Sequence, residues 1–466
     1  MKKNTLSFIS EPVFQIIGDT ADAEGIDCYV VGGYVRDRFL NRDCKDIDFV
    51  VIGDGPRFAR KIAGALGTRH LSVYRRFGTA MITYLDLTLE FVGARRESYQ
   101  KDSRKPEVEQ ADLAADIARR DFTINTMAIA LNRNNRGQLV DLHHGLHDLQ
   151  HHLIKTPLEP EKTFFDDPLR IMRAVRFASK FQFKIEVKTR EGIKSEAQRL
   201  SIISQERITD ELIKILLTPK PSVGLSLMDE CGIFKIILPE IDRLKGVEQI
   251  GRHRHKDVFA HTLKVVDNVS GMSNDPRLLL TALFHDIAKP PTKAYVPSVG
   301  WTFHGHEEVG ARMFERLGKR LRLSNETIEY VAKLIRLHLR PISLSEEGVT
   351  DSAIRRLIFK AGNDIEDLIT LCRADITSGN PKRVKRHLSN FDHVVERIQQ
   401  VEEKDHIREF QPPVRGDEIM QVCGISPGPA VGRIKNAIQD AILNGEIPND
   451  HDAAFQYMMR IKEQYL

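Results

Sequence analysis

The chain has 466 residues, of which 41% are hydrophobic and 29% charged, and its formal net charge is +4. This length exceeds one compact core and favours about three domains, while the composition is that of an ordinary globular protein. A net charge this small excludes a polycationic chain, so any nucleic-acid binding must come from local basic clusters.

Two further properties concern the compartment. No stretch approaches the roughly eighteen apolar residues that a membrane helix requires, so we expect no membrane contact. The segment MKKNTLSFISEPVF lacks the apolar run and cleavage site of a secretory signal. The five cysteines are scattered, which favours reduced thiols and argues against a cysteine zinc site. We therefore expect a cytoplasmic protein, and the sequence leaves its oligomeric state open.

The first 150 residues predict an α/β unit. Residues 26–33 form an apolar run that ends in two glycines, which predicts a buried strand followed by a tight turn. Three more strands are predicted at residues 46–52, 79–84 and 87–92, and a helix at residues 56–66. From about residue 163 the apolar spacing becomes helical, and the rest of the chain is predicted to be almost entirely helical.

Changes in pattern divide the chain into four predicted parts. A basic turn at residues 251–257 and a segment with two prolines at residues 402–415 mark boundaries within the helical region. The predicted parts are an α/β head at 1–155, a helical neck at 156–245, a helical domain at 246–400 and a helical tail at 401–466. The predicted fold class is therefore α+β.

Carboxylates and glycines stand close together in the predicted head. Asp46 and Asp48 lie two positions apart on a predicted strand, so both side chains point to one face. Oxygen ligands on a rigid face suit Mg²⁺, and Glu90 on another predicted strand offers a third carboxylate. Gly32 and Gly33 allow the backbone to approach a triphosphate. Asp-x-Asp alone is commonly a solvated strand edge, but together with the glycines it predicts two-metal phosphoryl transfer.

Five motifs in a fixed order carry a resemblance to a known family. They are GGYVRD with DIDFVV at 32–51, RRDFTINTMAI at 119–129, DLHHG at 141–145, DDPLRIMRAVRFA at 166–178 and ERITDEL at 206–212. Together they resemble the class II nucleotidyltransferases of the polymerase beta superfamily, which include bacterial tRNA CCA-adding enzymes and poly(A) polymerases. The resemblance implies a polymerase-beta-like head with a mixed sheet, Mg²⁺ as cofactor, and 3′ extension of tRNA from CTP and ATP.

The resemblance also implies how a base is chosen without a template. An aspartate and an arginine read the base in this family, and Asp167 and Arg170 match them, with an i, i+3 spacing on a predicted helix. Cytosine and adenine both offer an amine beside an acceptor ring nitrogen, which suits this pair. Guanine and uracil would leave both groups unpaired, at a cost on the order of 1–3 kcal/mol each. The structural alternative is a surface ion pair.

Other matched positions complete the predicted nucleotide site. The predicted nucleotide-binding residues besides the glycines and the base-reading pair are Arg36, Asp37, Arg119, Arg120, Asp121, Asn125, Arg173 and Arg176. By resemblance, the first two support the metal site and the next three contact the triphosphate and ribose. Asp141 and Gly145 match a flexible segment that helps the pocket switch between C and A. The family usually has Glu where this chain has Asp166, which puts a supporting contact in doubt.

Three residues of this set also have purely structural interpretations. Arg120 and Asp121 would form a simple ion pair, and Asn125 would be a helix residue without a ligand.

Residues 258–380 hold a second set, of histidines and aspartates on several predicted segments: His261, His285, Asp286, His304, His306, His338 and Asp375. A lone histidine is usually packed or exposed, but a set of this size with a His-Asp doublet indicates a metal site. Imidazoles with carboxylates suit Mn, Ni, Zn or Fe better than Mg²⁺. The pattern resembles the HD phosphohydrolase superfamily.

That resemblance assigns the ligands and implies phosphoester hydrolysis. The core ligands are His261, His285, Asp286 and Asp375, and the extra pair of two-metal members is His306 and His338. A 2′,3′-cyclic phosphodiesterase or phosphatase would clear blocked RNA ends that lack the hydroxyl needed by the head. His304 is a ligand, a substrate contact or only a neighbour of His306.

Contacts to RNA are less marked in the sequence. Basic clusters occur at residues 252–256, 319–322 and 382–387, and the last follows Asp375 closely enough to guide RNA toward the HD site. Glycines precede a basic helix at residues 425–443, a geometry that binds phosphate. Aromatic residues make up 7% with one tryptophan, so we expect shape and backbone recognition rather than base-stacking platforms.

The prediction is a member of this nucleotidyltransferase family that adds C, C and A to tRNA and carries an HD domain. One alternative is a poly(A) polymerase or a single-base enzyme on the same scaffold. Another is an HD phosphohydrolase whose head only binds RNA.

Overall fold

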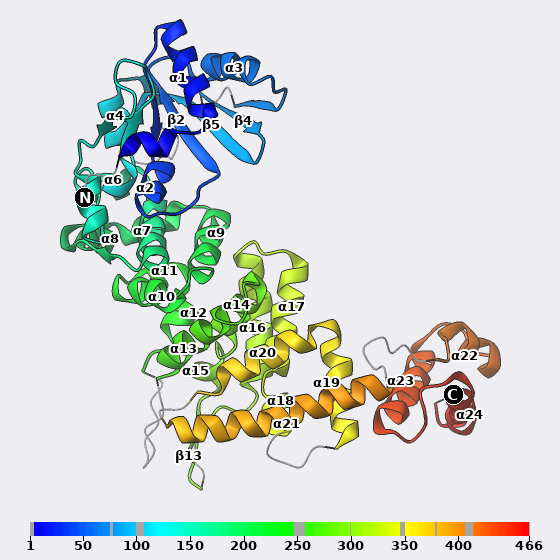
Figure 1. Cartoon of the computed structure of the whole chain (residues 1–466). Helices are drawn as coiled ribbons and strands as arrows, with labels where there is room; N and C mark the ends of the chain where they lie inside the picture. The colour runs from blue at the N-terminus through cyan, green and yellow to red at the C-terminus, as the bar shows by residue number, and fades with distance from the viewer. Residues whose placement is uncertain are drawn as a thin grey trace. The chain divides into compact units, whose positions relative to one another are not determined.

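A computed structural model describes residues 4–74, 78–98, 107–246, 257–298, 300–344, 350–377, 380–405 and 413–465. The chain forms two compact units, Met1–Leu238 and Pro239–Leu466. The first unit contains the large sheet and the second is helical apart from one hairpin (Figure 1).

The head is built on a mixed seven-stranded sheet. Its strands, in spatial order, are β3 (Leu71–Tyr74), β4 (Thr79–Tyr84), β5 (Leu87–Gly93), β2 (Asp46–Val51), β1 (Cys28–Val31), β8 (Ala128–Ala130) and β9 (Leu139–Val140). β2 and β5 run parallel, and the other neighbours are antiparallel. This arrangement places the two strands that carry the predicted carboxylates side by side.

Helices cover the apolar face of this sheet. They include α1 (Pro12–Glu24) and α3 (Gly55–Ala65), which pack against each other, with α3 also against β4 and β5. Alternation along β2 buries Ile47 and Phe49, and Phe49 stacks on Phe91 of β5 with ring centroids 4.8 Å apart. The opposite face of β2 is thus left to Asp46 and Asp48.

Shorter elements complete the head: η1 (Thr5–Ile9), α2 (Gly33–Phe39), β6 (Arg95–Ser98), β7 (Glu107–Gln110), α4 (Leu113–Ala118), η3 (Thr123–Asn125), α5 (Gly145–Gln150) and β10 (Leu153–Ile154). The predicted strands at 46–52, 79–84 and 87–92 and the helix at 56–66 are confirmed within a residue. The strand expected at 26–33 is shorter, because Gly33 already begins α2.

The neck is helical with one short strand. Its elements are α6 (Pro160–Asp166), α7 (Leu169–Phe181), β11 (Lys184–Ile185), α8 (Val187–Glu196), η4 (Ala197–Ile202), α9 (Gln205–Leu216), α10 (Pro221–Glu230) and α11 (Ile233–Ile237). The expectation that Asp167 and Arg170 share a helix is wrong. Asp167 is extended, with φ −138° and ψ 97°, because a residue before proline disfavours the helical region. Pro168 is then the N-cap of the next helix, α7.

The second unit places an apolar helix at its centre. The described helices before the tail are α12 (Pro239–Asp242), α13 (Val258–Ser270), α14 (Pro276–Phe284), α15 (Lys289–Thr292), α16 (His306–Arg320), α17 (Asn325–Leu337), α18 (Arg340–Leu344), α19 (Asp351–Ala361), η5 (Gly362–Asp364), α20 (Ile365–Asp375) and α21 (Pro381–Asp405). Residues 278–284 of α14 are all buried, and α14 packs against α13, α17 and α20 (Figure 1).

One hairpin and the tail complete this unit. The hairpin is β12 (Ala294–Val296) with β13 (Gly300–Thr302), and the tail consists of α22 (Gly416–Cys423), α23 (Pro429–Asn444), α24 (His451–Ile461) and η7 (Lys462–Gln464). The hairpin is an exception to the predicted all-helical region. None of the described helices has the length and apolar character needed to cross a membrane.

The predicted domain boundaries remain predictions. The basic turn at 251–257 lies outside the described residues except for Asp257, and so does residue range 406–412 within the second boundary segment.

Candidate active sites

Three carboxylates share one face of the head sheet. Asp48 of β2 lies directly opposite Glu90 of β5 in the parallel register, and Asp46 is two positions before Asp48. Paired residues in neighbouring strands project to the same side, so all three side chains do so. Asp46 and Glu90 are exposed and Asp48 is half-buried. The predicted catalytic carboxylates are therefore brought together on a solvent-facing surface.

The electrostatics of these carboxylates fit a divalent cation. Burial raises the pKa of Asp48, Asp46 adds to this, and the Arg120 guanidinium opposes it. Burial and the nearby Asp48 also raise the pKa of Glu90. Their charged forms are thus disfavoured in the protein alone, and a bound cation would relieve that repulsion. This donor set of oxygens suits Mg²⁺.

Gly32 is required at the start of α2. Its φ is 72°, and a Cβ there would lie 2.9 Å from Arg120 Nη1 and 3.5 Å from Asp48 Oδ2. The N–H of Gly32 already donates to the Met127 carbonyl at 3.2 Å. The Gly32 amide is therefore not available to a ligand, and the predicted approach of a triphosphate would have to use the space beside Gly32 and the amides from Gly33 onward.

A pocket of about 460 Å³ opens beside Asp48. It is lined by Gly32, Gly33, Arg36, Asp48, Arg119, Arg120, Asp121, Asn125, Asp167, Leu169, Arg170, Arg173, Arg176, Phe177, Lys180 and Arg207. Eight of these side chains are cationic and three are carboxylates, an excess that suits a polyphosphate. Every predicted nucleotide-binding residue except Asp37 lines this pocket.

A chain of hydrogen bonds crosses the floor of the pocket. Asp121 Oδ2 accepts from Arg173 Nε at 2.9 Å and Nη2 at 2.6 Å, while Oδ1 accepts from Asn125 Nδ2 at 2.9 Å. Burial alone would raise the pKa of Asp121, but Arg173 and Asn125 outweigh it and lower that pKa to about 2. Asn125 Oδ1 accepts from Arg36 Nη1 at 2.6 Å. Asp121 therefore stays charged and holds this arrangement in place.

Two expectations change as a result. The Asp37 carboxylate accepts hydrogen bonds from Arg36 Nε at 2.8 Å and from Arg36 Nη2 at 2.9 Å, so Asp37 orients an arginine that lines the pocket. The alternative ion pair between Arg120 and Asp121 is wrong, because Asp121 is bound to Arg173 instead.

The two base-reading candidates meet at the helix break. The backbone N–H of Arg170 donates to the Asp167 carbonyl at 3.0 Å, so the residues are neighbours without sharing a helix. Arg170 Nη2 donates to the Arg119 carbonyl at 2.6 Å, which fixes the guanidinium. Among the described residues, Asp167 Oδ1 accepts a 3.2 Å bond from the Leu169 N–H and Oδ2 lies 3.6 Å from Arg207 Nη2, so this carboxylate retains acceptor capacity toward the pocket.

Asp141 and Gly145 have a clear local role. Asp141 accepts the N–H groups of Gly145 at 2.6 Å and Leu146 at 3.0 Å, and so caps α5. A Cβ on Gly145 would lie 2.2 Å from the Thr123 carbonyl oxygen. This motif therefore packs α5 closely against η3, which carries Asn125. Its predicted part in switching between C and A stays a prediction.

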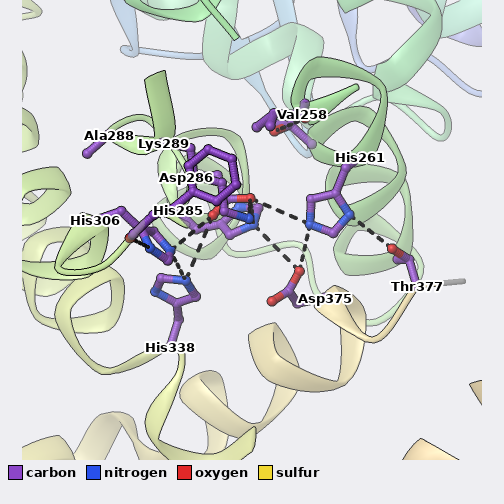
Figure 2. A network of polar contacts seen from close by, with 12 residues as sticks. Val258, His261, His285, Asp286, Ala288, Lys289, His306, His338, Asp375 and Thr377 are labelled. Carbon is purple, nitrogen blue, oxygen red and sulfur yellow. Dashed lines mark hydrogen bonds and ion pairs between the residues drawn. The ribbon is translucent and has the colours of Figure 1, made fainter. Parts of the chain in front are cut away.

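The HD residues form a compact cluster in the second unit. Figure 2 shows Asp286 between two groups, with His306 and His338 on one side and His261 with Asp375 on the other. His261 Nε2 is 2.8 Å from Asp375 Oδ1 and 3.7 Å from Asp286 Oδ2. The cluster draws on residues in or directly after five helices: α13, α14, α16, α17 and α20.

Asp286 is common to two possible metal positions. Among the described residues, three ligand atoms lie within 4.8 Å of one another in two sets, His261 with His285 and Asp286, and Asp286 with His306 and His338. His285 Nε2 is 3.2 Å from Asp286 Oδ2, and His306 Nε2 is 3.4 Å from Asp286 Oδ1. The two oxygens of one carboxylate thus face different sets, the arrangement that a bridging ligand requires.

Contacts at the Nδ1 atoms fix the orientation of the histidine rings. The Nδ1 atoms of His285, His306 and His338 lie 2.9, 2.8 and 2.6 Å from backbone carbonyl oxygens. His261 Nδ1 lies 2.9 Å from Thr377 Oγ1. A carbonyl oxygen accepts a hydrogen bond from Nδ1–H, and the Nε2 lone pair is then left for the centre of the cluster, which is the usual support for a metal-binding imidazole.

The interior of this cluster fits a cation. His285 Nε2 and Asp286 Oδ1 are buried without a hydrogen-bond partner among the described residues. Burial, with a contribution from His285, lowers the pKa of His338 to about 4, so its ring is neutral at pH 7. Burial also lowers the pKa of His285, but Asp286 and Asp375 outweigh it and raise it to about 10. A proton on His285 thus balances two carboxylates, and a metal would take its place.

Comparison with known proteins places both clusters within matched domains. Residues 28–155 match the Poly A polymerase head domain, residues 182–245 the probable RNA and SrmB-binding site of polymerase A, and residues 258–380 the HD domain. A CC-adding tRNA nucleotidyltransferase of Thermus thermophilus is 30% identical over 439 residues, which cover 92% of each chain. The chain belongs to the tRNA nucleotidyltransferase family.

Other members of the tRNA nucleotidyltransferase family are similarly related. An A-adding tRNA nucleotidyltransferase of Deinococcus radiodurans is 29% identical, over 91% of this chain and 93% of the relative. A multifunctional CCA protein of Aliivibrio salmonicida is 31% identical, over 74% of this chain and 84% of the relative. A CCA-adding enzyme in apo form I shares the fold, with a TM-score of 0.66 over 98% of this chain and 96% of its own, at 22% identity.

These findings confirm the predicted family, enzyme class and fold: a nucleotidyltransferase head followed by a helical region with an HD domain. They also imply dependence on divalent metals.

Sequence reasoning missed several residues of this tRNA nucleotidyltransferase. The buried Asp116 accepts from Arg119 Nη2 at 2.6 Å and Arg120 Nη2 at 3.3 Å, and so holds both arginines at the pocket wall. The spacing of three and four residues was a visible signal. Arg207, which lies within the ERITDEL motif, places Nη2 3.6 Å from Asp167 Oδ2.

In the HD domain, Lys289 was missed. Its Nζ lies 2.6 Å from Asp286 Oδ2, three residues along the chain (Figure 2). His304 is exposed and belongs to neither ligand set among the described residues.

The basic clusters have different surroundings. Arg320 pairs with Glu240 through both guanidinium nitrogens, at 2.9 and 2.8 Å, which neutralises part of the cluster at 319–322. In the cluster at 382–387 on α21, Lys382, Arg383, Lys385 and Arg386 are exposed. The cluster at 252–256 lies outside the described residues.

Proposed function

We propose that this chain adds C, C and A in turn to the 3′ end of tRNA, using CTP and ATP. The observation that carries the proposal is the single pocket in which Asp167 and Arg170 lie with Asp48 and a surplus of arginines. Such a pocket holds the base-reading groups, the triphosphate-binding groups and a catalytic carboxylate within reach of one nucleotide. The activity belongs in the cytoplasm, which agrees with cysteines that are all free.

The residues of the head have distinct parts in this reaction. Arginines of the pocket bind the triphosphate, while Asp121 and Asp116 hold several of those arginines in position. Asp46, Asp48 and Glu90 would hold Mg²⁺, which supplies charge neutralisation for the reacting phosphates. The terminal hydroxyl of the tRNA attacks the α-phosphorus, a new P–O bond forms, and the bond to pyrophosphate breaks.

Base choice follows from fixed donors and acceptors. The Arg170 guanidinium is anchored by the Arg119 carbonyl, and the Asp167 carboxylate is held by its bond to the Leu169 N–H. An acceptor beside a donor matches the amine and ring nitrogen of cytosine and adenine and opposes guanine and uracil. Each unmatched group costs on the order of 1–3 kcal/mol, which is roughly fivefold to 150-fold discrimination.

Specialised addition is the alternative on the same scaffold. Relatives of similar identity are named CC-adding and A-adding enzymes, while another is named a multifunctional CCA protein. A poly(A) polymerase uses a head of the same type. All of these would share the Asp167 and Arg170 pair, so the length and composition of the product must decide.

The test is incorporation of each labelled nucleotide, singly and together, onto tRNA that lacks CCA, CC-ended tRNA and tRNA that already ends in CCA. We expect two C from CTP alone, one A onto the CC end, and arrest thereafter. Addition of C without A, or of A only to the CC end, would move the assignment to a specialised enzyme. An open-ended A ladder would mean a poly(A) polymerase.

A second activity is supported by the HD cluster. The imidazoles gathered around the Asp286 carboxylate favour a transition metal such as Mn, Ni, Zn or Fe over Mg²⁺, and the filled ligand positions favour an active phosphohydrolase. On an RNA end with a 2′,3′-cyclic phosphate, the oxygen of water would bond to phosphorus and the bond to O3′ would break. This leaves a 2′-phosphate and a free 3′ hydroxyl.

Hydrolysis of a cyclic-phosphate-ended RNA, assayed with each metal in turn, tests this activity. Product in the presence of a transition metal supports it. Absence of product with all metals would leave the HD domain as a structural metal site.

A further inference from the structure

The direction of the Asp167 side chain is not fixed by a continuous helix. Asp167 follows the last residue of α6 and has an extended backbone, so neither α6 nor α7 runs through it. Its N–H donates to the Thr163 carbonyl over a long 3.4 Å, and its Oδ1 accepts a 3.2 Å bond from the Leu169 N–H. The position of the end of α6 therefore decides where this base-reading candidate points.

Arg199 of η4 contacts the end of α6 in two ways. Its guanidinium carbon lies 3.9 Å from the centre of the Phe165 ring, a close cation–π contact. Its Nη2 also donates to the Phe165 carbonyl oxygen at 3.1 Å. The Arg199 side chain is 22% exposed, so water screens these contacts little. One arginine thus holds both the ring and the backbone of the residue that lies two positions before Asp167.

The segment that carries Arg199 is itself anchored in the neck. Leu200 of η4 is fully buried, and η4 packs against α8 and α11. At the other end of α6, Gly192 of α8 lies so close to Pro160 that a Cβ on the glycine would be 2.4 Å from the proline Cβ. The consecutive elements α8 and η4 therefore hold α6 at both ends, and Arg199 holds the end that leads to Asp167.

The other groups of the nucleotide pocket have supports of their own. Arg170 Nη2 donates to the Arg119 carbonyl at 2.6 Å, and Arg173 is paired with Asp121. The contacts of Arg199 are instead with α6 and with the preceding turn of its own segment. A change at Arg199 should therefore displace the acceptor that reads the amine of a base, and leave the donor and the triphosphate-binding arginines in place.

We propose that Arg199 is a positioning residue for base choice, which fixes the end of α6 so that the Asp167 carboxylate meets the exocyclic amine of cytosine or adenine. The proposal rests on the base-reading pair proposed above and adds a residue that does not line the pocket. Without Arg199, the Asp167 carboxylate would be free to turn away. The carbonyl that uracil and guanine carry in place of the amine would then no longer be repelled.

The test compares Arg199→Ala with the parent as full-length proteins acting on tRNA that lacks CCA. The ratio of kcat/KM for CTP to that for UTP should fall about tenfold, because a cation–π contact and a hydrogen bond are lost together. Competitive inhibition by inorganic tripolyphosphate should keep its constant, since the arginines of the pocket stay in place. An unchanged nucleotide ratio would overturn the proposal. Equal losses of CTP and tripolyphosphate binding would also overturn it, because Arg199 would then support the whole pocket.

Further variants show whether Arg199 acts through Phe165. Arg199→Lys keeps a cation beside the ring and should retain most of the nucleotide ratio. Phe165→Leu removes the ring, and its effect should not add to that of Arg199→Ala in the double variant, because both changes break one contact. Fully additive effects would overturn the proposed route. Arg190→Ala is the matched control, an exposed arginine of α8 that lies 3.9 Å from Glu230 and should leave the ratio unchanged.

Measurements on the parent separate this proposal from the proposed function. If the parent adds C, C and A and Arg199→Ala discriminates equally well, the function stands and the positioning role is rejected. If the parent adds a single kind of base, CCA addition is rejected, and the ratio of CTP to UTP or of ATP to GTP still tests Arg199. Equal affinities of the parent for CTP and UTP, measured by equilibrium dialysis without tRNA, would reject base reading and the role of Arg199 together.

Discussion

The two metal sites of this chain are built in opposite ways. The carboxylates of the head lie on neighbouring strands and face solvent, and Asp48 alone of the three is half-buried. In the HD domain, Asp286 is 1% exposed and its neighbours come from helices far apart in the chain. The HD cluster is complete before any ligand arrives, whereas the head site offers only part of a coordination shell.

This difference matches the coordination preferences of the metals proposed for the two sites. Mg²⁺ is held by few carboxylates and takes its remaining ligands from water and substrate phosphates. Imidazole ligands bind transition metals, and fixing each ring through Nδ1 prepares the site in advance. We therefore expect the head to bind its metal together with the nucleotide, and the HD domain to retain its metal through purification.

The largest expected effect is from Asp48→Asn in the head. This change removes a negative ligand from the face shared with Glu90 while preserving the size of the side chain. We expect nucleotidyl transfer in a single turnover to fall about a thousandfold. The metal content of the purified protein, measured by mass spectrometry, should stay unchanged because that metal belongs to the HD domain.

Asp86→Asn is the control for this variant, since Asp86 is an exposed partner of Lys45 between β4 and β5. It should transfer nucleotides at the parent rate. Retention of full activity in Asp48→Asn would remove this carboxylate from the catalytic set.

The complementary variant is Asp286→Asn. Asp286 belongs to both sets of ligand atoms, so its neutral analogue weakens both metal positions at once. We expect the purified protein to lose most of its bound metal and hydrolysis of cyclic-phosphate ends to fall by at least about a hundredfold. CCA addition should persist, and it serves as the internal test that the variant is folded.

Asp392→Asn provides the matched control, because Asp392 lies exposed on α21 and pairs with Arg373 of α20. If Asp286→Asn kept its metal content, a bridging role for that carboxylate would be ruled out.

Local spacing explains which parts of the head were predictable. Asp46 and Asp48 follow the two-residue period of a strand, so their common face could be inferred from sequence. The position of Glu90 opposite Asp48 depends on the strand order, which no local pattern encodes. Asp167 was misplaced because apolar spacing continues across Pro168, while the backbone does not.

In the HD domain, the predicted ligands came from the resemblance, and the structure brings them together in one cluster. The position of Asp286 between two sets of ligand atoms arises from the packing of helices separated by many residues, whereas its contact with Lys289 follows from a local spacing of three residues. The hairpin was missed because two three-residue strands carry too little alternation to be distinguished from a loop.

A smaller effect is expected at the base-reading pair. Arg207 Nη2 lies 3.6 Å from Asp167 Oδ2, and both side chains are partly exposed. Ion pairs of this kind contribute up to about 1 kcal/mol, so Arg207→Gln should reduce discrimination against UTP by about fivefold or less. The measurement is the ratio of kcat/KM for CTP to that for UTP.

Arg190→Gln, which alters an exposed arginine on α8 near Glu230, is the control. A variant of Arg207 that lost all transfer activity instead would mean that this arginine binds the triphosphate.

The smallest effect concerns pH and distinguishes the open head site from a preformed one. The pKa values of Asp48 and Glu90 are raised, so these carboxyls keep their protons to higher pH than ordinary ones. Transfer at low Mg²⁺ should therefore be full above the raised pKa values and decline as the pH falls through them. Because Mg²⁺ and protons compete for the same oxygens, a tenfold rise in Mg²⁺ should move the acid limb to lower pH. The acid limb should move by at most about one pH unit if each Mg²⁺ ion displaces one proton. Rates of C incorporation across pH at two Mg²⁺ concentrations measure this shift. If the acid limb lay at the same pH at both Mg²⁺ concentrations, the metal would be bound before the carboxylates titrate, as in a preformed site.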